Sequence, residues 1–411
     1  MRVRIEPSVA YGKVVVPPSK SYAHRLLIAA SLSDKESIVS NVALSNDIIA
    51  TINCLKTLGK NIEILDDVNG NNKIIKINTI VNFEDLDSEL VFDCLESGSS
   101  LRFFIPIALL TGKTVKFIGT EKLISRGILP YEEICLKQNI KVIKEKTSIT
   151  FIGKLSSDEF IIPGNISSQF ISGLLFALPL LAGNSSIKIT NTLESKNYID
   201  ITLDVLKQAG IKIDEQEKIY NICGNQQYQP NNYFVEGDYS NAAFLDAFNY
   251  FGGNVELIGL NPDSYQGDKV YKKYFELLSD DFQILDLSNC IDLGPIMFGF
   301  AAMKHGAKFI GTKRLKIKES DRILAVDAEI DKFQAKLSEF DDFVVIDKQI
   351  LSKPKKLLNG QNDHRIVMML SVMASVYGGT IDGVEAVNKS YPAFFKDLER
   401  LGIEVHYNVD E

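Results

Sequence analysis

Residues 205–213 read VLKQAGIKI, and this short phrase indicates how the whole chain is built. A Leu-rich helical pattern ends at Gly210, which tolerates the left-handed conformation common at helix C-termini, and alternating Ile211 and Ile213 then begin a strand. Similar phrases start at residues 54, 135, 275, 330 and 397. These spacings are too long for a solenoid repeat, but each has room for a few strands and two helices. The sequence therefore predicts a repeated α/β architecture.

The six phrases predict two domains, each with three repeated units. The first boundary is expected at the proline pair Pro17–Pro18, and the second in the polar stretch GNQQYQPNNY (224–233). The predicted domains are residues 1–18 with 229–411 (domain I) and residues 19–228 (domain II), so the chain would cross between them twice. The alternative is that the phrases are chance echoes of ordinary βα sequence patterns.

Composition limits the classes of function. The chain has 411 residues, 45% apolar and 24% charged, which is enough for two large cores. A formal net charge of −8 argues against a nucleic-acid or anionic-membrane partner, so any anion site must be a local pocket. The five cysteines are scattered and form no CxxC pair, which predicts a reduced, cytoplasmic protein without structural zinc.

The apolar stretches of the chain do not resemble targeting or membrane segments. The N-terminal MRVRIEPSVA lacks the apolar region of a signal peptide. The longest apolar stretches, 101–110 and 170–182, are broken by Pro106 and by Gly173 and Pro179. They are too short to span a bilayer, and we expect them to be buried helices.

The stretch PPSKSYAHR (17–25) places two cations and two hydroxyls at the start of a helix. The prolines end the preceding strand, and we expect the helix to begin near Ser21 as its N-cap. Lys20, Ser21 and Arg25 would then lie at a helix N-terminus, where backbone amides already favour an anion. The alternative is a capped helix with two solvated cations.

Other polar phrases in the first half repeat this arrangement. ESGSSLRFF (96–104) puts Gly98 and two serines before Arg102 at the head of a buried helix, where an anion could approach the backbone. In PGNISSQFISGLL (163–175), capping needs one serine, which leaves a second hydroxyl and the amide of Gln169 spare. Single candidates that could equally be surface or helix-terminal residues are Arg126, Ser195 and Tyr198.

The second half carries denser groups of charge. In KIKESDRI (316–323), Lys318 and Arg322 are like charges four residues apart, which is easier to understand if both face one anion. Arg365 follows Asp363 and His364 where a buried helix begins. Asp292 stands at the mouth of another such helix and could be its cap. Lys389 precedes a proline-led helix.

No phrase offers an activated nucleophile or a phosphate-binding GKS/T loop, and the histidines have no metal-ligand spacing. What remains is a set of cations, hydroxyls and isolated carboxylates. This inventory suits acid/base chemistry on polyanionic small molecules.

Eight motifs in chain order resemble one known family. They are PPSKSYAHR, the Gly-Ser-Ser-x-Arg turn, ISSQ, SKNYIDIT, EGDYSNAAF, KIKESDRI, NDHRI and KSYPAFF. In this order they are similar to the EPSP synthases, the 3-phosphoshikimate 1-carboxyvinyltransferases. The resemblance implies two similar domains of three βαβαββ units each, an inside-out α/β barrel, with the active site in the cleft between the domains.

The resemblance also implies a reaction. The enolpyruvyl group of phosphoenolpyruvate would pass to the 5-hydroxyl of 3-phosphoshikimate by addition and elimination, releasing phosphate, in chorismate and aromatic amino acid biosynthesis. It implies no metal or organic cofactor. We expect a monomer with no nucleic-acid or membrane partner.

Site residues follow from the resemblance, motif by motif. The residues expected to bind 3-phosphoshikimate are Lys20, Ser21, Arg25, Ser167, Ser168, Gln169, Ser195, Asp292 and Lys318, with Tyr198 lining the site. The residues expected to bind phosphoenolpyruvate are Lys20, Gly98, Arg126, Gln169, Arg322, Arg365 and Lys389. The catalytic residues would be Asp292 as proton acceptor and Glu319 as proton donor, with Lys20. The sequence departs from the family pattern at Glu96, after Arg126 and at Arg314.

Two other functions stay open from the residues alone. A related UDP-N-acetylglucosamine enolpyruvyl transferase would want a reactive cysteine on a loop, and no cysteine here has that setting. A non-catalytic binder of anionic metabolites would keep the arginines without needing both Asp292 and Glu319. For the enzyme, we expect unsatisfied positive charge in each domain to hold the unliganded form open until 3-phosphoshikimate closes it.

Overall fold

The computed structural model describes residues 1–67, 72–79 and 83–407, and the chain divides into two compact units. Unit 1 is Met1–Pro17 with Gly237–Glu411, and unit 2 is Pro18–Glu236. The second crossing lies later than the predicted boundary after residue 228. The polar stretch 224–233 belongs to unit 2, because Tyr228 is buried there and its hydroxyl donates to the Phe176 carbonyl at 2.7 Å.

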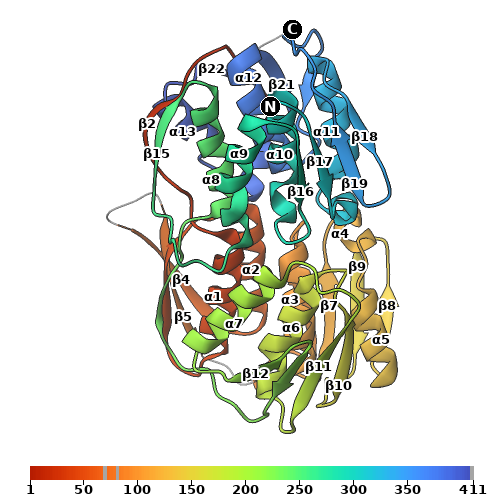
Figure 1. The fold of residues 1–411 in the computed structure, drawn as a ribbon. Helices are drawn as coiled ribbons and strands as arrows, with labels where there is room; N and C mark the ends of the chain where they lie inside the picture. The colour runs from red at the N-terminus through yellow and green to blue at the C-terminus, as the bar shows by residue number, and fades with distance from the viewer. Residues whose placement is uncertain (68–71, 80–82, 408–411) are drawn as a thin grey trace. The chain divides into compact units, whose positions relative to one another are not determined.

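Unit 2 is built from four-stranded sheets with helices between the strands (Figure 1). In spatial order, the first sheet is β14 (Asn232–Phe234), β3 (Ser37–Val42), β5 (Lys73–Thr79) and β4 (Lys60–Asp66). The second is β6 (Glu89–Asp93), β7 (Thr114–Ile118), β9 (Ser148–Ile152) and β8 (Lys141–Lys144). The third is β10 (Glu159–Pro163), β11 (Ser185–Thr190), β13 (Ile219–Ile222) and β12 (Ile213–Gln216).

The helices of unit 2 connect these strands in a repeating order. They are α1 (Lys20–Leu32), α2 (Asn46–Thr57), α3 (Gly98–Leu109), α4 (Glu121–Ser125), α5 (Leu129–Lys137), α6 (Ser168–Ala177) and α7 (Lys196–Gln208). In each sheet the first two strands are parallel and the remaining pairs are antiparallel. The chain runs β10, α6, β11, α7, β12, β13, so the predicted βαβαββ unit is confirmed.

Unit 1 repeats the pattern with strands from both ends of the chain. One sheet is β16 (Gln283–Asp286), β17 (Ala307–Ile310), β19 (Phe343–Ile346) and β18 (Leu337–Glu339). Another is β20 (Leu358–Asn359), β21 (Gly379–Asp382), β1 (Arg2–Ile5) and β22 (Val405–Tyr407), and β2 (Tyr11–Val15) pairs with β15 (Asn254–Ile258). The helices are α8 (Tyr239–Ala247), α9 (Tyr271–Asp280), α10 (Gly294–Met303), α11 (Arg322–Ile330), α12 (His364–Tyr377) and α13 (Phe394–Arg400).

Each unit has its own apolar core, and the most apolar helices lie at its centre. The buried helices expected near 101–110 and 170–182 are confirmed as α3 and α6. Helix α3 continues through Pro106 and is not broken there. None of the helices in the described ranges is both long and apolar enough to cross a membrane.

Several of the polar sequence motifs lie in or beside short 3-10 helices. They are η1 (Phe83–Asp85), η2 (Leu178–Leu180), η3 (Phe248–Phe251), η4 (Gly267–Val270), η5 (Ile291–Leu293), η6 (Lys313–Ile317), η7 (Asp331–Phe333) and η8 (Val384–Lys389). Asp292 lies in η5 and Lys389 ends η8. Because η6 ends before Lys318 and α11 begins at Arg322, these two cations do not share a helix, contrary to the i,i+4 reading of the sequence.

Candidate active site

In unit 2, Lys20 is held by a carboxylate. It is the first residue of α1, and Ser19, not Ser21, is the N-cap, accepting from the backbone N–H of Tyr22. The predicted cap was wrong by two positions because Ser19 has the extended backbone that a cap needs. The Nζ of Lys20 lies 2.7 Å from Oδ2 of Asp47, in the first turn of α2, and both side chains are largely buried. Lys20 is therefore not a solvated cation.

Arg25 is buried and organises its neighbours. Its guanidinium donates to Thr202 Oγ1 at 2.7 Å, to the Ser21 carbonyl at 2.8 Å and to the Tyr198 carbonyl at 3.1 Å. The guanidinium carbon also lies 4.9 Å from the centre of the Phe103 ring. Burial lowers the pKa of Arg25 to about 10, so the side chain stays cationic at neutral pH. Here too the solvated alternative is wrong.

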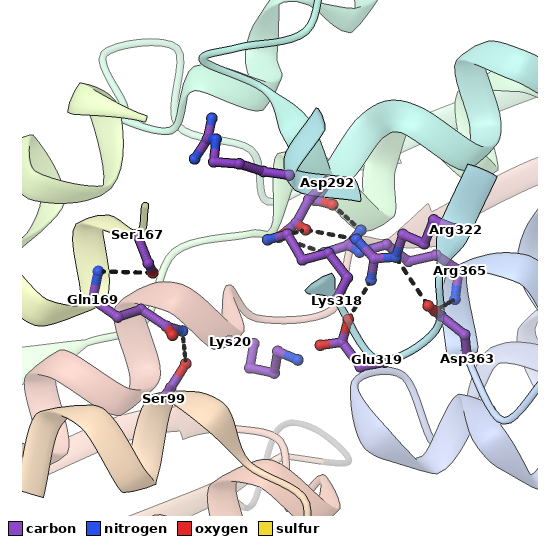
Figure 2. A network of polar contacts seen from close by, with 12 residues as sticks. Lys20, Ser99, Ser167, Gln169, Asp292, Lys318, Glu319, Arg322, Asp363 and Arg365 are labelled. Carbon is purple, nitrogen blue, oxygen red and sulfur yellow. Dashed lines mark hydrogen bonds and ion pairs between the residues drawn. The ribbon is translucent and has the colours of Figure 1, made fainter. Parts of the chain in front are cut away.

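The starts of α3 and α6 are joined through Gln169 (Figure 2). Its Oε1 accepts from Arg102 Nη1 at 2.8 Å, and its Nε2 donates to Ser99 Oγ at 2.9 Å. Ser167 caps α6 by accepting from the Gln169 backbone N–H. The side-chain amide of Gln169 is therefore not spare, as the sequence had indicated, because it connects the two polar phrases.

Gly98 lies against two guanidinium groups. A Cβ at this position would come 2.8 Å from Arg102 Nη1 and 3.0 Å from Arg126 Nη1. Both arginines are thus placed beside the backbone N-terminus of α3, where helix amides favour an anion. The geometry brings the predicted Gly98, Arg126 and Gln169 together and adds Arg102, which is buried.

The remaining unit 2 candidates are helix-start residues. Ser195 precedes α7 with φ 55°, a left-handed conformation that is uncommon for serine, and its side chain does not cap the helix. Ser168 opens α6 and is buried. The Tyr198 carbonyl accepts from Arg25, which ties the start of α7 to α1.

In unit 1, Asp292 is the centre of a compact charge cluster (Figure 2). Its Oδ1 lies 3.1 Å from Lys318 Nζ and 2.9 Å from Arg322 Nη1, and its Oδ2 lies 3.2 Å from Arg365 Nη2. The two cations Lys318 and Arg322 do face one anion, as their spacing suggested, and in the described chain that anion is Asp292. Helix α10 begins after Leu293 without a side-chain cap, so the capping role for Asp292 is wrong.

Arg322 is fully buried and binds a carboxylate with each of its nitrogens. Besides Asp292, Nη2 lies 2.7 Å from Glu319 Oε2 and Nε lies 2.9 Å from Asp363 Oδ2. Burial lowers the pKa of Arg322, but the charges of the three carboxylates outweigh it and raise the pKa above its ordinary value. Asp363 also caps α12 by accepting from the Arg365 backbone N–H at 3.0 Å.

Arg365 and Lys389 are held at the edge of this cluster. Nη1 of Arg365 donates to the Ser240 hydroxyl, in the first turn of α8. Nζ of Lys389 donates to the Asn362 carbonyl at 2.7 Å. Both side chains are buried.

The charges of the cluster set the ionisation of its carboxylates. Burial would raise the pKa of Asp292, but Arg365, Lys318 and Arg322 together hold it well below its usual range. A further carboxyl, Asp268 in η4, is buried beside the cluster, and burial with the charge of Asp292 raises its pKa to about 7.

These ion pairs contradict the expectation that each domain presents unsatisfied positive charge. Lys20, Lys318, Arg322 and Arg365 each have a carboxylate within hydrogen-bonding distance, so they do not present unsatisfied positive charge. The physical reason is that a buried cation without a partner is too costly to keep.

The comparisons with known proteins agree across the chain. The family model for EPSP synthase (3-phosphoshikimate 1-carboxyvinyltransferase) matches residues 6–283 and 278–398. A 3-phosphoshikimate 1-carboxyvinyltransferase of Clostridium perfringens (strain 13 / Type A) is 40% identical over 431 residues, covering 98% of each chain. One from Clostridioides difficile (strain 630) is 39% identical, covering 97% of each chain.

The chain belongs to the EPSP synthase family. Its activity is accordingly that of a transferase in the shikimate pathway of aromatic amino acid biosynthesis. The solved EPSP synthase of Acinetobacter baumannii has the same fold, with a TM-score of 0.78 at 20% identity, covering 98% of this chain and 99% of that one. The family and the pathway step predicted from the eight motifs are confirmed.

The site residues predicted from the family resemblance form two sets, one in each unit. Sequence reasoning missed Asp47, Asp268 and Ser240 as neighbours of the predicted cations. Asp47 follows Ser45 and Asn46, a pattern typical of an ordinary helix start. No sequence motif marks Asp268. Across residues 1–67, 72–79 and 83–407, no group of three or more His, Cys, Asp or Glu side chains is arranged to hold a metal ion.

Proposed function

We propose that the chain transfers the carboxyvinyl group of phosphoenolpyruvate to the 5-hydroxyl of 3-phosphoshikimate, using residues from both units. The observation that carries the proposal is the Asp292 carboxylate held by Lys318, Arg322 and Arg365. This arrangement pairs a base with cations that can turn to a substrate anion. We further propose that the unit 2 set around Lys20, Gly98, Arg126 and Gln169 supplies the other half of the site.

The cations of the proposed site would offset the repulsion between the two anionic substrates. Each substrate carries a phosphate and a carboxylate, and two such molecules at bonding distance repel by several kcal/mol, on the order of 4 kcal/mol per charge pair at 4 Å and an effective dielectric of about 20. Arginine binds carboxylate and phosphate through paired N–H donors, while lysine acts as a movable point charge. Lys318 and Arg365 would exchange part of their contact with Asp292 for these anions.

That exchange would also activate the base. Asp292 is ionised in the cluster, so it can accept a proton, but the cations make it a weak base. When substrate anions draw Lys318 and Arg365 away, the pKa of Asp292 rises and it can take the proton of the attacking hydroxyl. Arg322, with all three nitrogens on carboxylates, would hold Asp292 and Glu319 in place and contribute less to substrate binding than its motif implied.

Glu319 is the proposed proton donor to the methylene carbon of phosphoenolpyruvate. Its ion pair with Arg322 favours the carboxylate form, so it would gain its proton only when substrate anions surround it. A tetrahedral ketal intermediate would then form, and loss of phosphate with return of one methyl proton to the Glu319 carboxylate would restore the vinyl group. The absence of nucleic-acid and membrane partners stays a prediction from net charge, and the cytoplasmic location stays a prediction from cysteine usage. The monomeric state also stays a prediction.

Phosphate release tests this function directly. The chain is mixed with phosphoenolpyruvate and 3-phosphoshikimate, and phosphate should form only when both are present. Asp292→Asn should lower kcat by about 10²–10⁴-fold, the range for a positioned acid or base. The function fails if no phosphate appears, or if phosphate forms with UDP-N-acetylglucosamine in place of 3-phosphoshikimate.

A further inference from the structure

Glu329 is a buried carboxylate of unit 1 that lies outside the charge cluster. It belongs to the last turn of α11, and only 1% of its side-chain surface is exposed. Both of its oxygens contact Lys332 Nζ, at 2.9 and 2.8 Å. Oε2 also accepts from the Asn359 backbone N–H at 2.8 Å, and Oε1 accepts from Gln361 Nε2 at 3.0 Å. Glu329 therefore binds the last residue of β20 and the segment that follows it.

That segment contains two consecutive left-handed residues. Gln361 has φ 53° and Asn362 has φ 51°. A non-glycine residue in this region costs free energy and persists where surrounding contacts fix it. The turn is also held by Gln361 N–H, which donates to Asn359 Oδ1 at 2.7 Å, and by Asp363 N–H, which donates to the Gly360 carbonyl at 2.9 Å.

The turn contacts the residues of the proposed phosphoenolpyruvate site. The Asn362 carbonyl accepts from Lys389 Nζ, and the next residue, Asp363, binds Arg322 and the backbone of Arg365. Helix α11 thus contacts this segment at both ends, through Arg322 at its first residue and Glu329 in its last turn. A helix is rigid over this length, so the two contacts fix the turn relative to the cluster.

We propose that Glu329 is a positioning residue: by holding Asn359 and Gln361 it fixes the left-handed turn that places Lys389 and Arg365 for phosphoenolpyruvate. The inference rests on the proposed function of those two cations. It assigns Glu329 no contact with substrate.

The test is Glu329→Gln in the full chain, with both substrates titrated. The amide keeps one acceptor oxygen and loses the other, so one of the two contacts to the turn is lost while side-chain size is kept. We expect KM for phosphoenolpyruvate to rise about tenfold, in the range seen when a remote change displaces a binding group. KM for 3-phosphoshikimate should change by less than about twofold.

Asp246→Asn is the matched control. Asp246 in α8 accepts from Tyr271 Oη at 2.9 Å and from Asn249 Nδ2 at 2.8 Å, so its loss weakens unit 1 without touching the turn. If both variants lower the melting temperature but only Glu329→Gln raises KM for phosphoenolpyruvate, Glu329 positions the site. If both variants shift both KM values alike, or Glu329→Gln shifts neither, the inference is wrong.

A second pair of variants covers the case in which Glu329→Gln does not fold. Gln361→Ala and Gln361→Gly both remove the Gln361 contact, but glycine adopts φ 53° without the cost that alanine meets. We expect KM for phosphoenolpyruvate to rise more for Gln361→Ala than for Gln361→Gly. Equal, wild-type KM values for both overturn the inference. A wild-type chain that releases no phosphate would instead count against the proposed function.

Discussion

At the scale of single residues, the buried charges of unit 1 depend on one another. Arg322 is fully buried, and it is tolerated because Asp292, Glu319 and Asp363 each accept one of its donors. Removing Arg322 would leave the fully buried Asp363 carboxylate without its arginine counterion, and breaking a buried ion pair in this way typically costs about 3–5 kcal/mol. These residues are thus fixed by stability as well as by chemistry.

The raised pKa of Asp268 predicts how the stability of the fold changes with pH. Burial and the Asp292 charge raise its folded-state pKa to about 7, partly opposed by Arg365, with smaller effects of Asp238 and Lys318. In the unfolded chain the pKa returns to about 3.9. The folded state therefore binds this proton more tightly, and the resulting stabilisation is fully present below about pH 4 and lost as pH rises to about 7.

Asp268→Asn should remove this dependence. The melting temperature of the variant relative to the unsubstituted chain should be higher at pH 8 than at pH 4, as measured by thermal unfolding at both pH values. Asp292 and Asp363, whose pKa values are lowered, are common to both proteins, so their opposite pH dependence largely cancels in the comparison. A difference that does not change with pH would contradict the prediction.

At the scale of elements, the approach of α3 to α6 is set by a glycine. A Cβ at Gly173 would lie 2.3 Å from Tyr131 Oη and 2.5 Å from the Arg102 carbonyl. Tyr131 Oη already donates to the Arg102 and Phe170 carbonyls, so it cannot move freely. The close contact brings the two helix starts together and allows Gln169 to reach Arg102.

Gly173→Ala should destabilise unit 2 by about 1–3 kcal/mol, the usual cost of overpacking, as read from denaturant unfolding. Tyr131→Phe removes the nearer of the two atoms. The double variant should therefore be more stable than the sum of the single effects predicts. Strict additivity would show that Tyr131 does not limit the approach of the helices.

At the scale of the whole molecule, the two units differ in connectivity. Unit 2 is one continuous segment, whereas unit 1 needs β1 and β2 from the N-terminus to pair with β21, β22 and β15. The strands at both ends of unit 1 are therefore held by long-range pairing.

A fragment spanning residues 18–236 should fold alone, because its sheets and core come from within it. We expect a cooperative thermal transition in circular dichroism. A fragment spanning residues 237–411 lacks β1 and β2 and should not show one. A cooperative transition in the second fragment alone would contradict this account.

Under the proposed function, 3-phosphoshikimate binds cations from both units. Its binding should therefore reduce the radius of gyration in small-angle scattering. The repulsion first invoked for the open form is not needed, since the main cations have carboxylate partners. An unchanged radius of gyration with saturating ligand would argue against closure.

The sequence by itself indicated a repeated α/β unit and the family, and the family resemblance implied the βαβαββ order of that unit. Helix endings, strand alternation and motif order are local properties, so they can be read along the chain. It misplaced the N-cap of α1 and the second crossing between the units. The first depends on which of several serines has an extended backbone, and the second depends on the burial of Tyr228.

Only the tertiary structure decided which charges meet. Lys20 with Asp47, Arg102 with Gln169, and Asp292 with Arg365 are far apart in the sequence, and no local pattern pairs them. Folding selects these partners because a charge removed from water needs an opposite charge or a hydrogen bond within reach. The choice depends on how helices and sheets pack, and for that reason it cannot be read from neighbouring residues.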